Sequence, residues 1–174
     1  LTPNGPDLGG PFQGVLNKPK VAILSGDGTS AYGAGEIWHL VNHRMQIPVS
    51  LIDASNLTRR KLSKYNTMIL PDGSYSKLDS SDIKSMKEWV SGGGSLISVQ
   101  SASRWVVKNG LIKEELVENE KLSYDIPYDQ VRLVSGAQRI GGAIFNVEMD
   151  NTHPIAYGYN DTHPVFRRGT TFFK

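Results

Sequence analysis

The chain has 174 residues, of which 39% are hydrophobic and 21% are charged, and its formal net charge is +2. A chain of this length makes about one domain and buries roughly 70% of the surface that its unfolded form exposes. It can therefore form a stable core without disulfides or structural metals. The scattered basic residues argue against a nucleic-acid surface, and no apolar run approaches the ~20 residues of a membrane span. The absence of cysteine removes disulfides, thiolate metal sites and cysteine nucleophiles together.

The first 19 residues contain four glycines and four prolines. Such a composition does not form a regular element and is typical of a linker. We therefore expect residues 1–19 to lead in from an upstream domain and residues 20–174 to form one α/β domain. Nothing at Lys174 signals an end, so a continuation of the domain beyond this residue stays open.

Regular structure is expected from residue 20 onwards. The apolar run 20–24 stops at a Gly-rich turn, as a buried parallel strand does. From Ala34 the apolar positions recur at helical spacing, at Ile37, Leu40, Val41 and Met45. The pattern predicts a strand, a turn and a helix.

The same unit then repeats in form. Residues 49–52, 67–70 and 95–99 read as further strands, and a helix with Ile83, Met86 and Val90 as its buried row lies between the last two. Ser80 or Ser81 is expected to cap this helix and Gly92 to end it in the left-handed conformation. A short helix over 102–108 follows. Strands that alternate with helices predict a parallel sheet joined by right-handed crossovers, on which the three tryptophans at 38, 89 and 105 pack.

The last third of the chain has a different pattern. Residues 139–149 read as a long strand or hairpin arm, for which antiparallel pairing is favoured, and residues 163–166 and 171–173 read as edge strands. His153-Pro154 and His163-Pro164 both resemble turn entries into strands.

The turn after the first strand is the strongest positional signal for a ligand. Gly26, Asp27, Gly28, Thr29 and Ser30 would lie at the carboxyl end of the sheet, where a helix start offers N–H groups to an anion. A dinucleotide-binding fingerprint would need glycine where Ala31 stands, and a Walker loop is absent. A small-ligand site and simple turn chemistry both remain open, the second being favoured.

The histidines do not complete a peptidase motif. His39 and His43 are four residues apart on one helix face, but Leu40 stands where the zincin motif needs its glutamate. None of the four histidines is followed by glutamate three residues later, as a carboxypeptidase site requires. We therefore expect no metal or other cofactor in this chain.

A nucleophile in this kind of sheet would lie at the sharp turn after the fourth strand. The residue at that position is Gln100, which cannot attack a carbonyl. Ser101 or Ser103 with His153 as base is the catalytic alternative. Helix capping explains both serines more simply, since glycines do not flank them.

Several stretches resemble the C-terminal domain of bacterial zinc carboxypeptidases of the carboxypeptidase A type. The stretches are Ser-Gly-Asp-Gly at 25–28, Ala-Gly-Glu-Ile-Trp-His at 34–39, Pro-Val-Ser-Leu-Ile-Asp at 48–53, Tyr-Asn-Thr-Met-Ile-Leu-Pro-Asp-Gly at 65–73, Gly-Gly-Gly-Ser-Leu-Ile-Ser-Val-Gln-Ser-Ala at 92–102, Gly-Gly-Ala-Ile-Phe-Asn-Val at 141–147 and Thr-His-Pro-Ile-Ala-Tyr-Gly-Tyr at 152–159. The resemblance implies a flavodoxin-like, class I glutamine-amidotransferase-like three-layer sandwich, with a mainly parallel sheet and antiparallel C-terminal additions. The amidotransferase cysteine falls on Gln100, and its His-Pro-Glu segment has only His153-Pro154, followed by Ile155, as a counterpart. The resemblance thus implies the fold without the activity.

The same resemblance implies a setting for the domain. The zinc ligands would belong to an upstream carboxypeptidase domain of the same polypeptide, which hydrolyses peptides and is exported to the periplasm or outside the cell. This chain would then act in domain packing or substrate access. An independent serine hydrolase or amidotransferase and a small-ligand module at Gly26–Ser30 are the alternatives, and the oligomeric state and the parent's substrate stay open.

Overall fold

The protein was analysed as a computed structural model, which describes residues 16–57, 61–117, 125–169 and 171–174. Its contacts divide the chain into two compact units, Leu1–Ile112 and Lys113–Lys174, and each unit is described by itself. Among the described helices, none has the length and apolar character needed to cross a membrane. Residues 16–19 are exposed and carry no regular element, while the rest of the expected linker lies outside the described residues.

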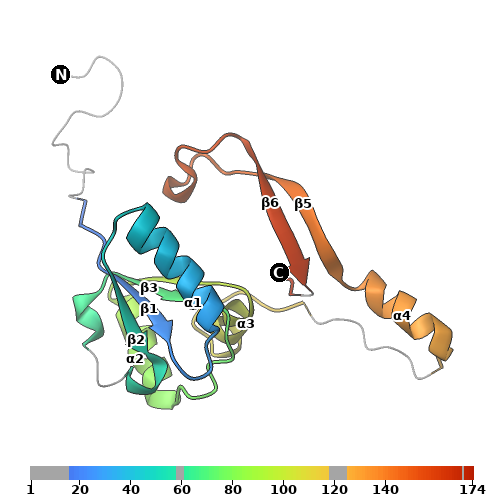
Figure 1. The fold of residues 1–174 in the computed structure, drawn as a ribbon, viewed down its shortest axis with the longest axis horizontal. Helices are drawn as coiled ribbons and strands as arrows, with labels where there is room; N and C mark the ends of the chain where they lie inside the picture. The colour runs from blue at the N-terminus through green and yellow to red at the C-terminus, as the bar shows by residue number, and fades with distance from the viewer. Residues whose placement is uncertain (1–15, 58–60, 118–124, 170) are drawn as a thin grey trace. The chain divides into compact units, whose positions relative to one another are not determined.

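The first unit is built on a four-stranded parallel sheet (Figure 1). Its strands are β1 (Val21–Ser25), β2 (Val49–Asp53), β3 (Thr67–Leu70) and β4 (Ser95–Ser98), in the order β2-β1-β3-β4. Every pairing in the sheet is parallel. The predicted parallel α/β architecture is therefore confirmed, and the predicted strand bounds hold to within one residue.

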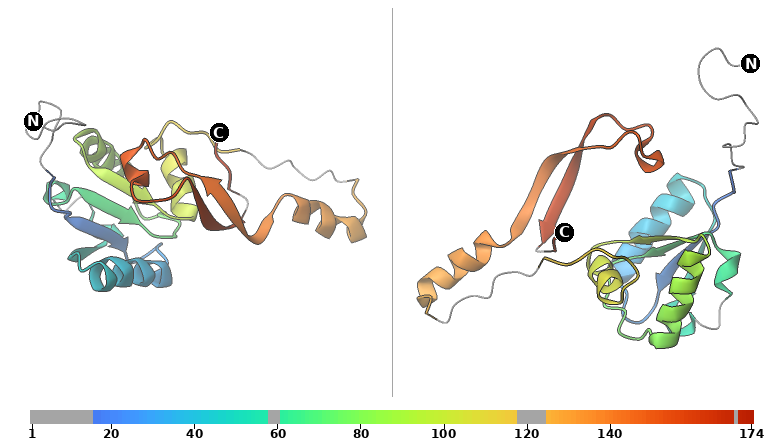
Figure 2. Two further views of the ribbon diagram at one scale, coloured as in Figure 1. Left: turned by 90° about the horizontal axis from the view of Figure 1, so that it is seen from above. Right: turned by 180° about the vertical axis from the view of Figure 1, so that it is seen from behind.

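Helices cover both faces of this sheet, which gives three layers. Figures 1 and 2 show α1 (Ala31–Trp38), continued by the π-helical segment η1 (His39–Arg44), on one face, and α2 (Ser80–Ser91) with α3 (Ser101–Lys108) on the other. Side chains of a strand alternate between the two faces, so each face has its own core. The α1 side buries Val21, Ile23, Ala34, Val41 and Ile69. The opposite side buries a larger group that includes Ala22, Leu24, Met68, Leu70, Met86, Ala102 and Val106.

The tryptophans at 38, 89 and 105 are partly buried against these two cores, as the sequence predicts. Short 3-10 turns complete the unit at η2 (Ala54–Asn56) and η3 (Leu62–Lys64).

The ends of α2 differ from the expectation. The N-cap is Asp79, not Ser80 or Ser81, because its carboxylate accepts hydrogen bonds from the backbone of Ser81 and Asp82 in a capping box. Gly92 ends the helix with a φ of −79°, and the left-handed residue is Gly93, with a φ of 99°. The predicted N-cap was therefore one or two residues too late, and the predicted left-handed glycine was one residue too early.

The second unit contains one helix and one hairpin. Helix α4 (Tyr128–Ala137), which the sequence analysis missed, precedes β5 (Ile140–Glu148), and β5 pairs antiparallel with β6 (Thr162–Gly169), as predicted for the C-terminal third. The 3-10 turn η4 (Pro154–Ala156) lies between the two strands, so His153 enters a turn and no strand. Residues 171–173 form no strand either, although Phe173 makes an isolated bridge with Leu116.

Candidate functional site

Three loops meet at the carboxyl end of the parallel sheet, where ligands bind in open α/β folds. They follow β1, β3 and β4. Backbone hydrogen bonds join the first two, since Ser30 N–H donates to the carbonyl of Asp72 at 2.7 Å and Ser74 N–H donates to the carbonyl of Gly28 at 2.8 Å. A β-bridge between Thr29 and Gly73 adds a further link. The loops thus form one connected junction.

Gly73 makes this close approach possible. A Cβ atom at this position would lie 2.5 Å from the carbonyl oxygen of Gly28 and 3.0 Å from Cα of Thr29. Both neighbours are backbone atoms, which a side-chain rotation cannot move. Only glycine fits where these loops cross.

Gln100 occupies the sharp turn between β4 and α3. Its φ of 56° and ψ of −121° lie in a region that residues with a side chain rarely adopt. A strained strand-to-helix turn of this kind displays the nucleophile in hydrolases built on parallel sheets. Gln100 is exposed and makes no capping hydrogen bond to α3. The structure therefore places Gln100 at an elbow, and the group displayed there is an amide.

Ser101, the residue after the elbow, is held by the loop after β3. Its backbone N–H donates to Oδ1 of Asp72 at 3.1 Å, and its hydroxyl donates to the same carboxylate. The N–H of Gly73 donates in turn to the Ser101 hydroxyl oxygen at 3.1 Å. Asp72 and Ser101 thereby bind the third loop to the junction, and the hydroxyl is fixed without an imidazole partner.

The other two catalytic candidates have structural roles. The Ser103 hydroxyl lies 3.1 Å from both the hydroxyl and the carbonyl oxygen of Ser98, which ties α3 to the end of β4. His153 belongs to the second unit, and its Nδ1 accepts a hydrogen bond from Ile155 N–H at 3.2 Å as the cap of η4. His153 is a cap, whereas the helix capping predicted for Ser101 and Ser103 is wrong, because the N-cap of α3 is Gln100 and no side chain caps that helix.

The Gly26–Ser30 turn makes hydrogen bonds within itself and to the segments beside it. The Thr29 hydroxyl donates to the carbonyl of Gly26 at 2.7 Å, and the Ser30 hydroxyl accepts from Gly33 N–H as the N-cap of α1. Gly26 and Gly28 have φ values of 92° and 84°, which explains the glycines at these positions. Asp27 is exposed. The predicted turn chemistry is present, and the polar contacts described for this turn are made within the turn, to the start of α1 and to the loop after β3.

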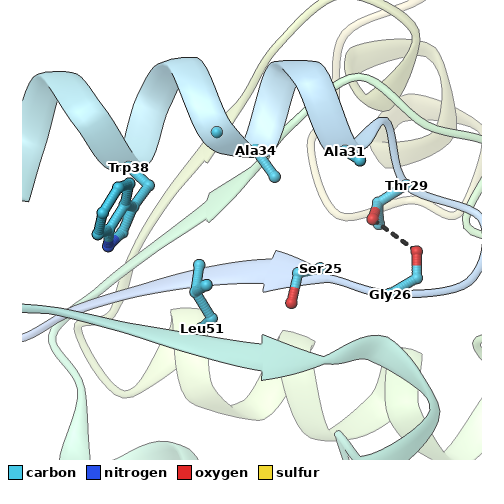
Figure 3. Close-up of a pocket in the computed structure, with 8 residues that line it drawn as sticks. Ser25, Gly26, Thr29, Ala31, Ala34, Trp38 and Leu51 are labelled. Atoms are coloured by element: carbon cyan, nitrogen blue, oxygen red, sulfur yellow. Dashed lines mark hydrogen bonds between the residues drawn. The ribbon is translucent and has the colours of Figure 1, made fainter.

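A cavity of about 290 Å³ lies beside this turn, between β1, β2 and α1 (Figure 3). Its lining is mainly apolar and consists of Ser25, Gly26, Thr29, Ala31, Ala34, Gly35, Trp38 and Leu51. The small residues on the sheet side of α1 leave the space. Such walls suit a small apolar group better than the anion that the turn suggested.

Tyr75 lies in the loop after β3, and the sequence patterns predicted no role for it. It is fully buried, has a φ of 54°, and its hydroxyl donates to the carbonyl of Pro71 at 2.6 Å. Burial raises the pKa of Tyr75 well above its usual value, and the negative charge of Asp72 raises it further. The phenol therefore remains a proton donor. The Pro-Asp-Gly end of β3 was the available sequence signal for this loop.

Comparison with known proteins supports the fold alone. No protein-family profile matches the sequence, and the search of curated proteins finds no match. The structure is similar to the crystal structure of a glutamine amidotransferase from Thermotoga maritima, with a TM-score of 0.54 and 12% sequence identity. The match covers 91% of this chain and 64% of the other, so this chain spans less than two thirds of that protein's length. The chain thus has a glutamine-amidotransferase-like α/β fold.

Proposed function

We propose that this chain is a non-catalytic amidotransferase-like module. The observation that carries the proposal is Gln100, which has the strained backbone of a nucleophile elbow and displays an amide there. An amide nitrogen is not a nucleophile, whereas amide hydrolysis on this scaffold requires a thiolate or alkoxide activated by an oriented imidazole. The scaffold is retained while the reacting atom is missing.

The environment of Ser101 supports the same proposal. In hydrolases with such an elbow, the N–H of the residue after the nucleophile helps to bind the oxyanion of the intermediate. Here that N–H donates to the carboxylate of Asp72. A fixed negative charge beside this donor opposes the development of a second one. Neither imidazole of the first unit is placed to activate Ser101, since His39 and His43 belong to η1, at the other end of helix α1 from the junction.

Ammonia release from glutamine tests the proposal. The wild-type chain and the variants Gln100→Cys and Ser101→Ala are compared with an active class I amidotransferase as the positive control. We expect no release above buffer from any of the three, because restoring the thiol supplies neither the base nor a free oxyanion donor. Release by the wild-type chain that Ser101→Ala abolishes contradicts the proposal.

We further propose that the module is the accessory domain of an exported zinc metallocarboxypeptidase. The support is the sequence resemblance and the Gly- and Pro-rich composition of residues 1–19. The zinc would be held by the upstream domain, and this module would orient that domain or restrict peptide access to it. The location would be the periplasm or the outside of the cell.

The genomic reading frame around this sequence tests the accessory role. An upstream segment with His-x-x-Glu and a distant histidine is expected. In the full polypeptide, deletion of residues 20–174 should leave the zinc ion of the upstream peptidase domain in place. The deletion should change KM for long peptides more than it changes kcat for short peptides. A free-standing short frame contradicts this part of the proposal and leaves the non-catalytic assignment untouched.

The cavity beside α1 supports a second candidate function, the binding of a small apolar ligand. Its volume of about 290 Å³ lies near the lower end of ligand pockets. Gly35 lines the cavity and a Cβ at this position meets no atom within 4 Å, so Gly35→Leu is the variant chosen to occupy the space. Indole and benzene serve as probes, followed by NMR shifts. Saturable shifts in the wild type that Gly35→Leu removes support the ligand role, and equal shifts in both proteins oppose it.

A further inference from the structure

The two histidines of the π-helical segment form a pair on the surface of the first unit. His39 is the first residue of η1 and His43 is the last but one. Both side chains are exposed. Neither takes part in the core, and neither belongs to the junction of loops at the carboxyl end of the sheet. Their type and spacing are those of imidazoles that share one metal ion on a helix face.

The separation of the two rings matches a shared ion. The ring centroids are 5.4 Å apart, with an angle of 29° between the ring planes. A Zn–N bond of about 2.0–2.1 Å places the ion about 3.2 Å from each ring centroid, and a tetrahedral angle at the ion then separates the centroids by about 5.2 Å. The two rings are stacked in the structure, so a rotation about the side-chain bonds, without a backbone change, is needed to turn a nitrogen of each ring toward one ion.

The backbone and one neighbour hold the pair in place. Met45 N–H donates to the carbonyl of Leu40 at 3.0 Å, which is the i to i+5 pattern of a π-helix, and such segments recur at functional sites. The edge of Trp38 contacts His43, with ring centroids 4.7 Å apart and planes at 84°. Trp38 itself packs against the core on the α1 side. His43 is therefore supported by a side chain that the fold fixes.

We propose that His39 and His43 form a binding site for a divalent late first-row transition ion, with Zn²⁺ as the reference ion. Neutral imidazole is a preferred ligand of zinc, nickel and copper, and water completes the coordination. Leu40 stands where a zincin carries its general base, so the site binds an ion without a hydrolytic group. The site differs from the expectation of a metal-free chain, and it is independent of the proposed non-catalytic function.

Zinc titration of the tag-free full chain tests the site. Isothermal titration with ZnCl₂ compares the wild type with His39→Ala, with His43→Phe and with His163→Ala as a matched control elsewhere in the chain. His43→Phe keeps an aromatic ring against Trp38 and removes the ligand, which separates coordination from packing. Thermal unfolding in EDTA verifies that each variant folds.

We expect about one saturable Zn²⁺ per wild-type chain. His39→Ala and His43→Phe should each weaken binding about tenfold or more, since even partners of ligands contribute that much, and His163→Ala should leave it unchanged. Equal affinity in the wild type and in the two site variants, or loss of binding in His163→Ala alone, overturns the proposal.

NMR of the wild type gives a second measurement that needs no variant. Zinc should shift or broaden the imidazole signals of His39 and His43 together and leave those of His153 and His163 in place. Shifts confined to His153 or His163 contradict the site.

Discussion

The two units of the chain bury their apolar residues to very different degrees. In the first unit Met86 on one side of the sheet and Ile23 on the other are both 0% exposed, each within a core. In the second unit Ile144 and Phe166 form a cross-strand pair yet are 72% and 66% exposed. Among the described residues of that unit, only Ala156 is buried.

The difference also concerns strain. Gln46, Tyr75 and Gln100 have positive φ angles, and all three lie in the first unit, while the described part of the second unit has no such residue other than glycine. Strained conformations persist where the surrounding structure fixes them. The strained turn at Gln100 and the junction of loops therefore occur in the first unit, which has a packed core to fix them.

The largest expected effect distinguishes the packed core of the first unit from the exposed hairpin of the second unit. Met86→Ala should destabilise the first unit by about 2–5 kcal/mol, because it opens a cavity in a packed core. Ile144→Ala should cost about 1 kcal/mol or less, because it removes only a cross-strand contact at an exposed position. Urea unfolding measures both, and equal losses contradict the comparison.

The next effect concerns the crossing of the loops after β1 and β3. Gly73→Ala should lower the free energy of unfolding by about 1–3 kcal/mol, since the new methyl group meets the Gly28 carbonyl oxygen at 2.5 Å. Gly35→Ala is the matched control, because its Cβ enters open space within α1 and should stabilise the helix by about 0.5–1 kcal/mol. Thermal unfolding distinguishes the two signs. A neutral Gly73→Ala shows that the loops do not cross as described.

A smaller effect measures the strain at the elbow. Gln100→Gly should raise the free energy of unfolding by about 1 kcal/mol, because the strain of about 1–3 kcal/mol that is relieved exceeds the entropy that glycine adds to the unfolded chain. Gln100→Ala retains the Cβ and should gain nothing. Chemical denaturation at one pH compares them, and a loss of stability in Gln100→Gly contradicts a strained elbow.

The smallest effect is electrostatic, at the start of α2. Hydrogen bonds from the Ser81 hydroxyl and then from the backbone N–H groups of Asp82 and Ser81 hold the pKa of Asp79 below its usual value. A lowered pKa in the folded state gives a contribution that is present above the unfolded pKa of about 4 and is lost as the pH falls through the folded one. The stability difference between the wild type and Asp79→Ala should therefore shrink in that acid range. A stability difference between these two proteins that grows on acidification contradicts this role of the Asp79 carboxylate.

The sequence was informative wherever one local rule decides the structure. Short apolar runs located the four parallel strands, two of which end at glycine turns, and the position after the fourth strand located the elbow at Gln100. The cap of α2 was misplaced because Asp79, Ser80 and Ser81 all suit a cap, and only the carboxylate of Asp79 reaches two N–H groups.

Other features depend on contacts between segments far apart in the chain. Asp72 gains its role from Ser101, 29 residues away, which no local pattern reports. Helix α4 was not predicted because none of its residues is buried, so its apolar residues do not form a stripe that faces a core. The cavity beside α1 is lined by the small residues Ala31, Ala34 and Gly35, and the predicted apolar stripe of that helix gave no sign of it.

The central claim is that the elbow carries no reacting group. Intact-mass spectrometry of the wild-type chain after incubation with a fluorophosphonate, a probe that phosphonylates activated serines, tests it most directly. The account predicts an unchanged mass under conditions that fully label a serine hydrolase. An adduct on Ser101 or Ser103 that the corresponding Ser→Ala variant abolishes would contradict it.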